Sequence, residues 1–526
     1  MSKSLKSIGV ISSLTAVSRV LGLFRDSLQL AIFGAGEVMS SFTTANIAPN
    51  LFRRLLAEGS MTAAFVPTLQ EELHANGKEG TFALLSKVAS WLLVITGVLV
   101  VTAMALFSGS RSLAPGHDDR WYLAADLTVL LFPYLAMISL SAAFSATLNV
   151  HQRFFEPALS PIWLNLCVLV SLGGAGAAYS RSPIAAIHWL CAGWLAGGFL
   201  QMAVPAGVLI HGGWRPRFDL GLSPRVREIA HLMTPGIFGT AIYQINFSVS
   251  RLLAFSLDDM SATYLYAINR LMEFPIGVFA VAVSTVVYPL IARHAVKGDF
   301  GSLAADFQKG IRLILVINIP AAVGLALLAG PIVQLIFRHG QVSAHDALRM
   351  GILLAVMAVG LPFFSVVNLM VRAFYAVKDT RTPVRVALVD FVINIGVSLV
   401  LIRYWGVVGI VVASTLAIIA QAVLLSRAIT RRMPGMRLAP LLPSLWKVLG
   451  ATAAMALVVR GGWQAVLLAH LGARPASLLA VAVLIPAGVA AYGLVLWRLR
   501  IEGREEISAM LARLPVAGRL FASPRA

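Results

Sequence analysis

The sequence predicts an all-α polytopic membrane protein, and three observations lead to this fold class. The chain has 526 residues, of which 58% are hydrophobic and only 12% are charged. A soluble protein carries about 25% charged residues. Apolar segments of about 20 residues, the length that crosses a bilayer as a helix, follow one another along the whole chain. The pattern of the first half also returns in the second half, at an offset of roughly 220–230 residues.

Fourteen segments are long and apolar enough to be transmembrane helices. Polar residues interrupt the second and the eighth of them. Beyond residue 497 the chain is charged and poor in aromatic residues, which indicates a helix at the membrane surface. The fourteen predicted spans lie near residues 8–33, 38–68, 82–108, 122–148, 157–179, 184–210, 227–256, 261–291, 304–329, 346–376, 384–403, 407–428, 442–468 and 476–497.

The distribution of lysine and arginine predicts the orientation. With the N-terminus in the cytoplasm, 27 of the 42 cations fall in cytoplasmic segments and eight in the opposite loops, with the rest inside the spans. Cytoplasmic loops of membrane proteins carry such an excess, so we expect both termini in the cytoplasm. The same rule accounts for the net charge of +19, which in a soluble chain would suggest nucleic acid.

Matched motifs predict an internal repeat. Pro133 corresponds to Pro362, Phe144 to Phe374 and Gln201 to Gln421. Each half then supplies six helices in the same orientation, a parallel repeat of the kind found in secondary transporters that bind substrate between the halves. The expected domains are a lobe at 1–215, a lobe at 216–435, two additional helices at 436–500 and a cytoplasmic tail at 501–526.

The stretch from Thr15 to Pro67 carries charges within apolar sequence. An arginine at the centre of a bilayer costs about 2.5–3.5 kcal/mol, so its charges should face a wet cavity or a protein partner. Helical spacing predicts one stripe of polar side chains and, beside it, a second stripe, together with an i, i+4 ion pair. These are Ser18, Gly22, Arg25 and Gln29 for the first stripe, Arg19 and Asp26 for the second, and Arg54 and Glu58 for the pair.

Seven cations lie at membrane depth, and all of them are arginine. The acids at that depth are fewer, so the predicted interior is positive. Because the planar guanidinium matches phosphate oxygens, a cavity lined by these residues implies an anionic ligand such as a phosphate or diphosphate. Pairing with acids on neighbouring helices is the structural alternative for some of them. The seven are Arg19, Arg25, Arg53, Arg54, Arg251, Arg270 and Arg372, and the acids are Asp26, Glu58, Asp126, Glu273 and Asp390.

The sequence offers no recognisable catalytic or cofactor motif. It contains no Walker A sequence, no HExxH and no cluster of cysteine and histidine, and Cys167 and Cys191 both lie in apolar segments. We therefore expect a transporter without cofactor or metal, which an ion gradient or the membrane potential drives.

Four motifs closely resemble the MurJ (MviN) family of bacterial lipid II flippases, which belongs to the multidrug/oligosaccharidyl-lipid/polysaccharide exporter superfamily. The resemblance runs from about residue 5 to about residue 500. The motifs are SRVLGLFRD (18–26), PNLFRRLLAEGSMTAAFVP (49–67), NRLMEFPIGVFAVA (269–282) and FYAVKDTRTPV (374–384).

The resemblance implies fourteen helices and a substrate, lipid II, in which undecaprenyl diphosphate carries a disaccharide-pentapeptide. It implies translocation from the inner to the outer leaflet for peptidoglycan synthesis by alternating access, a possible monovalent coupling ion, and a groove for the lipid tail at 442–468 and 476–497. The implied diphosphate and cavity residues are Ser18, Arg19, Arg25, Asp26, Arg53 and Arg270, and the gate or ion-pair candidates are Arg54, Glu58, Arg251, Asn269 and Glu273.

The chain departs from the family pattern at three positions. Ser40, Ser250 and Asn269 stand where relatives often have acids, which puts any gate that uses those acids in doubt. Three alternatives remain open: a flippase for another polyprenyl-diphosphate glycan, a cation-coupled antiporter of the same superfamily, and a membrane glycosyltransferase or phosphatase. An antiporter favours acids in its cavity, and an enzyme needs paired carboxylates or a metal site.

Overall fold

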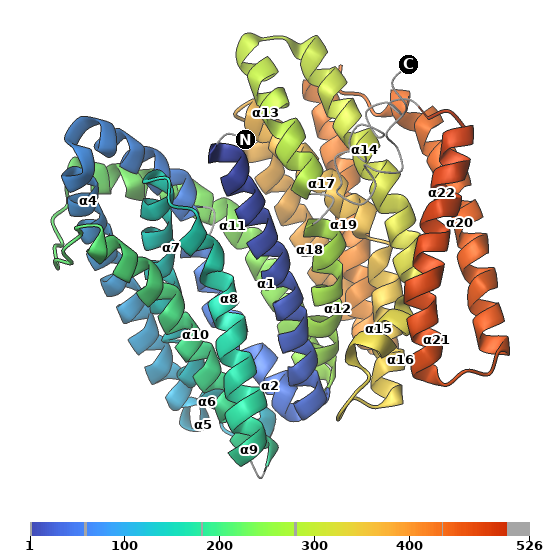
Figure 1. Cartoon of the computed structure of the whole chain (residues 1–526), viewed down its shortest axis with the longest axis horizontal. Helices are drawn as coiled ribbons and strands as arrows, with labels where there is room; N and C mark the ends of the chain where they lie inside the picture. The colour runs from blue at the N-terminus through green and yellow to red at the C-terminus, as the bar shows by residue number, and fades with distance from the viewer. Residues whose placement is uncertain (1–2, 57–59, 180–181, 278–280, 434, 502–526) are drawn as a thin grey trace. The chain divides into compact units, whose positions relative to one another are not determined.

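A computed structural model describes residues 3–56, 60–179, 182–277, 281–433 and 435–501, and every regular element in these ranges is helical (Figure 1). The elements are α1 (Lys3–Phe33), α2 (Glu37–Ala45), α3 (Ile47–Leu56), α4 (Ser60–Ser108), α5 (Ser110–Leu113), α6 (Asp119–Leu131), α7 (Tyr134–Val150), α8 (Phe155–Val170), the π-helix η1 (Ser171–Gly176), α9 (Ala177–Tyr179), α10 (Pro183–His211), α11 (Pro224–Leu257), α12 (Ser261–Pro275), α13 (Val281–Lys297), α14 (Phe300–Leu327), α15 (Ala329–Phe337), α16 (Ala344–Ala358), α17 (Leu361–Ala376), α18 (Arg381–Trp405), α19 (Val407–Arg432), η3 (Ala439–Leu441), α20 (Leu442–Leu468), α21 (Ala473–Leu479), the π-helix η4 (Ala480–Leu484) and α22 (Ile485–Arg498).

The all-α class is confirmed, while the number of fourteen spans stays a prediction. Within the described ranges nine helices are long and apolar enough to cross a membrane, and the pair α16 and α17, bent by 44°, makes a tenth. These ten correspond to ten of the fourteen predicted spans. The other four, at 8–33, 38–68, 227–256 and 261–291, are largely helical in the described residues, and two of them contain the short helices α2, α3, α12 and α13, of 9 to 17 residues. All seven membrane-depth arginines lie in these four segments or in the bent pair.

Besides the bent pair α16 and α17 at 346–376, three predicted spans are divided between helices in the described residues. The span at 38–68 is wrong as a continuous helix, because α2 ends at Ala45 and a new helix begins at Ile47. The following helix continues past 68 to Gly77, whose φ of 63° and ψ of −157° interrupt α4. Pro133 separates α6 from α7 in the span at 122–148, and the span at 261–291 ends its first helix at Pro275. Proline lacks an amide hydrogen and glycine tolerates positive φ, which fits the breaks at Pro133, Pro275 and Gly77.

The helices pack into two compact units. The first comprises residues 1–266 together with 339–343, and the second comprises 267–338 and 344–526. In the first unit α4 packs on α7, α10 on α7 and α8, α1 on α8, and α11 on α3 and α4. Its core contains Phe65, Leu85, Phe144 and Trp214. The expected lobe boundary at 215/216 follows the repeat rather than the packing, and it stays a prediction.

The second unit is built around α13, α14, α17 and α19, whose core includes Phe307, Leu369 and Phe374. The α18 helix packs along α19, and α20 and α22 lie side by side at the C-terminal end of the colour gradient (Figure 1). Val316 on α14 packs with Val448 and Leu496, and the Tyr492 hydroxyl donates a hydrogen bond of 2.6 Å to the Val316 carbonyl. The two additional helices are therefore an integral part of this unit.

Matched turns support the predicted repeat. Gln152 and Lys378 end α7 and α17 with φ values of 62° and 61°, although neither residue is glycine. In both turns this residue's amide bonds the carbonyl three residues earlier, and the next amide bonds the carbonyl five residues earlier, at 2.9 to 3.0 Å. Leu148 and Phe374 are the equivalent acceptors in the two turns, and the sequence pairing of Phe144 with Phe374 stays a prediction.

The loop between α15 and α16 packs on the C-terminal end of α1. The His339 imidazole lies 2.8 Å from the Ser27 hydroxyl, and the Gln341 amide donates to the Ala31 carbonyl at 2.8 Å. Gly340 has a φ of +60°, and a Cβ there would overlap the Ala31 carbonyl. Only glycine allows the loop to approach the helix this closely. Packing therefore assigns residues 339–343 to the unit of α1.

Replacing Gly340 by alanine tests this close approach. Gly298→Ala is the matched control, because Gly298 has a φ of +70° but open space around its Cβ position. Both changes should cost about 1–2 kcal/mol for positive φ. The overlap with Ala31 should add about 1–3 kcal/mol for Gly340→Ala alone. Thermal unfolding of the purified proteins in detergent should show the lower midpoint for Gly340→Ala. Equal midpoints would mean that the loop does not dock tightly.

Candidate functional site

Three polar side chains on α1 are buried although they lie within an apolar helix. Arg25 is 7% exposed, Asp26 1% and Gln29 0%. A charged side chain in such surroundings is costly unless an opposite charge and hydrogen bonds compensate it. The contacts of these residues therefore define the candidate site.

Arg25 and Asp26 form a buried ion pair. The Arg25 Nε donates to Asp26 Oδ1 at 3.0 Å, and its Nη2 donates to the same oxygen at 2.7 Å. The Tyr266 hydroxyl on α12 donates to this oxygen as well, at 2.8 Å. The sequence had placed Asp26 in one stripe with Arg19. The continuous helix α1 keeps that spacing, and the long Arg25 side chain folds back over its own helix to reach the adjacent residue.

Aromatic rings enclose the ion pair. The Arg25 guanidinium lies 4.9 Å from the centre of the Trp194 ring on α10. Trp194 makes edge contacts with Phe42, at 5.6 Å, and with Tyr134, at 6.4 Å between ring centres. A guanidinium over the face of tryptophan is stabilised by the charge distribution of the ring. Trp194 thus helps to hold Arg25 in an environment with little water.

Arg251 on α11 joins this group through Tyr266. Its guanidinium lies 5.4 Å from the Tyr266 ring and 5.0 Å from the Phe247 ring, and the residue is 8% exposed. We call Arg25, Asp26, Trp194, Arg251 and Tyr266 the arginine cluster. The cluster contains two cations and one carboxylate, so its own formal charge is positive.

Sequence reasoning identified only part of the cluster. Arg25, Asp26 and Arg251 were candidates, and the structure brings them together. Trp194 and Tyr266 were missed. The sequence signal around Trp194 was its position among Gly193, Gly197 and Gly198, whose missing side chains let α10 pack closely on Val168, Leu164 and Tyr134. Tyr266 stands three residues before the motif that begins at Asn269, and nothing in its pattern distinguished it.

The remaining candidates of the first unit make their contacts with residues outside the cluster. Arg19 is exposed on α1, and Ser18 is half-buried, with its carbonyl accepting a 3.0 Å bond from Asn165. On α3, Arg53 donates to Asn50 at 2.9 Å, and Arg54 donates to Gln244 of α11 at 3.4 Å. Glu58 falls outside the described residues, so its pairing with Arg54 stays a prediction.

In the second unit Arg270 pairs with Glu273 on the same helix, at 2.9 Å. Both side chains are partly accessible, with 30% of Arg270 and 51% of Glu273 exposed. Asn269 beside them is half-buried. Of the positions that lack the acids of relatives, Ser40 is fully buried and Ser250 half-buried, both in the first unit.

The chemistry of these residues is that of anion binding. Guanidinium groups donate paired hydrogen bonds to carboxylate or phosphate oxygens, and Asp26 already occupies one edge of Arg25 in this way. Among the described residues, no three or more His, Cys, Asp and Glu side chains are grouped to hold a metal ion. The arginine cluster therefore resembles a binding site in which an internal carboxylate stands where an external anion would bind.

Comparison with known proteins places the chain in a family. The profile of the family described as "Lipid II flippase MurJ" matches residues 30–471. A protein of Rhizobium meliloti, "Probable lipid II flippase MurJ", is 32% identical over 502 residues, which cover 93% of this chain and 92% of the relative. A protein of the same name from Haemophilus influenzae is 32% identical over 444 residues, 80% of this chain and 84% of the relative.

Solved structures show the same fold. "Lipid II flippase MurJ, inward closed conformation" aligns with a TM-score of 0.75 and 24% identity, covering 94% of this chain and 99% of that chain. An inward-facing multidrug resistance MATE family transporter of the MOP superfamily aligns with a TM-score of 0.64 and 13% identity, covering 82% and 98%. With the family profile and the 32% identical relatives, these findings show that this multi-pass membrane protein belongs to the MurJ family of lipid II flippases.

Proposed function

We propose that the chain translocates lipid II from the inner to the outer leaflet of the bacterial inner membrane. Family membership supports the substrate, since the relatives are named for it. The observation that carries the proposal is the arginine cluster, where two buried arginines accompany a single carboxylate. Such a site favours an anion, and the diphosphate is the anionic part that all polyprenyl-diphosphate lipids share.

We propose that Asp26 holds the place of the diphosphate when no substrate is bound. Its Oδ1 occupies the Nε and Nη2 edge of Arg25, which is an edge that a phosphate oxygen would use. Exchange of the carboxylate for a phosphate would keep Arg25 compensated throughout transport. Release of the substrate would be assisted when Asp26 returns. Arg251, which lies against Tyr266, would add its charge to the bound diphosphate.

The remaining roles follow the family and the repeat. Arg19, Arg53 and Arg270, with Ser18, are proposed to line the path of the head group, and Arg54, Glu58, Asn269 and Glu273 to form ion pairs or gates along it. The helices at 442–468 and 476–497 would hold the lipid tail. Alternating access between two six-helix lobes, driven by an ion gradient or the membrane potential, would move the substrate.

Two alternative functions have less support than lipid II translocation, and a third, an enzyme, is excluded. A flippase for another polyprenyl-diphosphate glycan would use the same arginine cluster, so competition between glycan lipids must distinguish it. A cation-coupled antiporter would favour carboxylates at its centre, whereas the cluster has an excess of guanidinium groups. An enzyme is excluded by family, because MurJ proteins are transporters.

Arg25 and Asp26 should respond in opposite ways to substitution. Arg25→Lys keeps the charge but loses the paired N–H donors of the planar guanidinium. Charge-assisted hydrogen bonds contribute about 1.5–3 kcal/mol each. Lipid II affinity of the purified protein should therefore fall tenfold to several hundredfold for Arg25→Lys, and further for Arg25→Ala. Asp26→Asn removes the competing anion and should bind lipid II at least as tightly as the unchanged protein while supporting growth poorly.

The control is Arg111→Lys, because Arg111 is 74% exposed and pairs with Asp126 at 3.7 Å outside the cluster. Membrane abundance of all variants should be normal. The alternative is that Arg25 only stabilises helix packing through its ion pair with Asp26. In that case Arg25→Ala will keep its lipid II affinity, and Asp26→Asn will be as unstable as Arg25→Ala. That pattern would refute a diphosphate site at Arg25.

Arg270 offers a test in the second unit. Arg270→Ala should abolish support of growth, whereas Glu273→Gln should be tolerated, because Glu273 is half exposed and the pair lies within one helix. Complementation of a depletion strain, with lipid II counted on the inner leaflet, measures this. Equal loss for the two changes would indicate that the ion pair itself is what the protein needs.

Orientation is testable by reporter fusions. Both termini are expected in the cytoplasm because of the 27-to-8 bias of lysine and arginine. An alkaline phosphatase fused after residue 526 should be inactive, and one inserted between residues 111 and 120 should be active. Activity at the C-terminus would require an odd number of spans and would contradict the fourteen-helix arrangement.

A further inference from the structure

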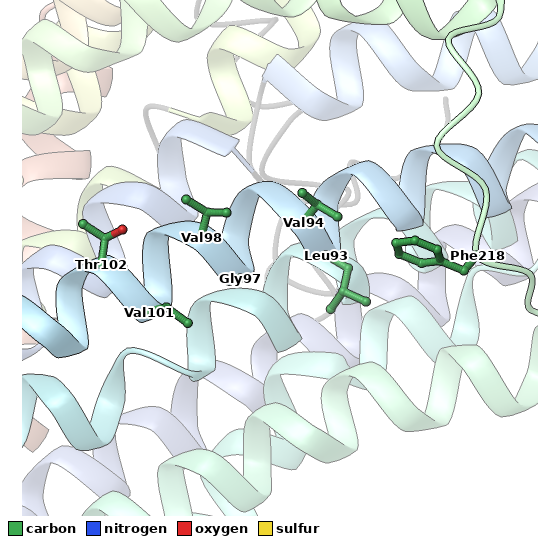
Figure 2. A pocket seen from close by; sticks show the side chains of 7 residues that line it. All are labelled: Leu93, Val94, Gly97, Val98, Val101, Thr102 and Phe218. Atoms are coloured by element: carbon green, nitrogen blue, oxygen red, sulfur yellow. The ribbon is translucent and has the colours of Figure 1, made fainter.

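An apolar groove runs along the outer face of α4, away from every residue of the arginine cluster. It has a volume of about 380 Å³ and is lined by Leu93, Val94, Gly97, Val98, Val101, Thr102 and Phe218. Figure 2 shows six of these residues in order along α4. Phe218 reaches one end of the row from the irregular segment between α10 and α11. Gly97 contributes the depression, because no side chain fills the surface there.

Phe218 is held at the groove by the segment between α10 and α11. This segment is attached to α4 by Trp214, whose Nε1 donates to the Ser86 hydroxyl at 3.0 Å, and by the Asp219 amide, which donates to the Ser90 hydroxyl at 2.9 Å. Trp214 is only 5% exposed and packs on Phe144. Yet the Phe218 ring between these anchors is 68% exposed. A fixed backbone thus presents an uncovered aromatic ring at the end of the groove.

Basic residues gather at this same end. Arg215 and Arg217 immediately precede Phe218 in the chain, and both are exposed. The Lys87 Nζ on α4 lies 3.9 Å from Asp219 Oδ2, and Asp219 contributes the negative charge at this end. Three cations and one carboxylate leave an excess of positive charge where the apolar lining stops. The segment is among those that the charge bias assigns to the cytoplasm, where anionic lipids concentrate.

The length of the groove fits one leaflet. Leu93 and Thr102 are nine residues apart, which corresponds to about 13 Å of α-helix. Half of a hydrocarbon core of about 30 Å is a similar distance. The lining side chains Val98 and Val101 are 61% and 68% exposed, as residues that face lipid are. The groove therefore extends about 13 Å along α4 from its basic end, a length comparable to one leaflet.

We propose that this groove binds an anionic phospholipid of the cytoplasmic leaflet, with one acyl chain along α4 under Phe218 and the phosphate beside Lys87, Arg215 and Arg217. The polyprenyl tail of the proposed substrate is a poorer fit, because it is branched and far longer than a groove that ends at Thr102. A zwitterionic phospholipid would match the apolar lining but would not use the excess positive charge.

Native mass spectrometry of the purified full-length protein tests the proposal. Phosphatidylglycerol and phosphatidylethanolamine with identical acyl chains are added separately to delipidated protein. Val98→Trp fills the groove, and Val392→Trp is its control, because Val392 is equally exposed (62%) on α18 outside the groove. The double change Arg215→Gln with Arg217→Gln removes the cations, and Arg403→Gln with Arg474→Gln removes two exposed arginines elsewhere.

Phosphatidylglycerol should bind the unchanged protein and both controls with equal affinity, and phosphatidylethanolamine should bind at least fivefold more weakly. Each removed groove arginine should weaken phosphatidylglycerol binding about fivefold, the usual effect of one cation at an anionic membrane surface. Val98→Trp should lose this binding without losing lipid II binding at the arginine cluster.

Three results would overturn the proposal. These are equal binding of the two phospholipids, an unchanged phosphatidylglycerol affinity in Val98→Trp, and displacement of the bound phosphatidylglycerol by undecaprenyl phosphate at equal concentration. Lipid II binding to the arginine variants of the groove is measured in parallel, so failure of this proposal is separable from failure of the proposed function.

Discussion

The cost of placing charge inside a hydrocarbon layer is the constraint on which the rest of this protein depends. Arg25 is compensated by one carboxylate oxygen that also accepts the Tyr266 hydroxyl, and by the face of Trp194. These partners come from α1, α10 and α12, so the charge is tolerated only when the first unit has folded around it. The helix α1 thus buries charge on one face and exposes apolar side chains such as Val20 and Phe24 on another.

The same constraint bears on the segments that carry charge at membrane depth. The helices α1, α3, α11 and α12 carry six of the seven membrane-depth arginines. A helix that faces lipid must be apolar, whereas a helix enclosed by others is free to carry function. The arginine cluster combines side chains of such helices with Trp194 from the apolar α10.

Phosphate recognition is proposed at two places, which differ in how far their cations are exposed to solvent. In the arginine cluster the guanidinium groups are buried, so few charges and exact geometry give strong and selective binding. At the α4 groove the cations are exposed and screened by solvent, so several are needed and the apolar lining contributes much of the binding. The first arrangement suits a substrate that must be released, and the second suits a membrane lipid that remains in place.

The sequence by itself determined the fold class, ten of the spans, the repeat and the residue types of the site. Composition and apolar length are local properties, and so is the surplus of arginine over acid at membrane depth. Only the tertiary structure decided how these residues combine. Adjacent residues of a helix point in different directions, so no spacing rule pairs Arg25 with Asp26.

Trp194 and Tyr266 lie well over a hundred residues from Arg25 in the chain and reach it only through helix packing. The break at Gly77 and the matching turns that follow Leu148 and Phe374 depend on backbone angles and hydrogen bonds, which residue types alone do not specify. Helical periodicity thus identified the residues able to bind an anion. The contacts that hold them in a dry and compensated site required the folded chain, because they join helices that are distant in sequence.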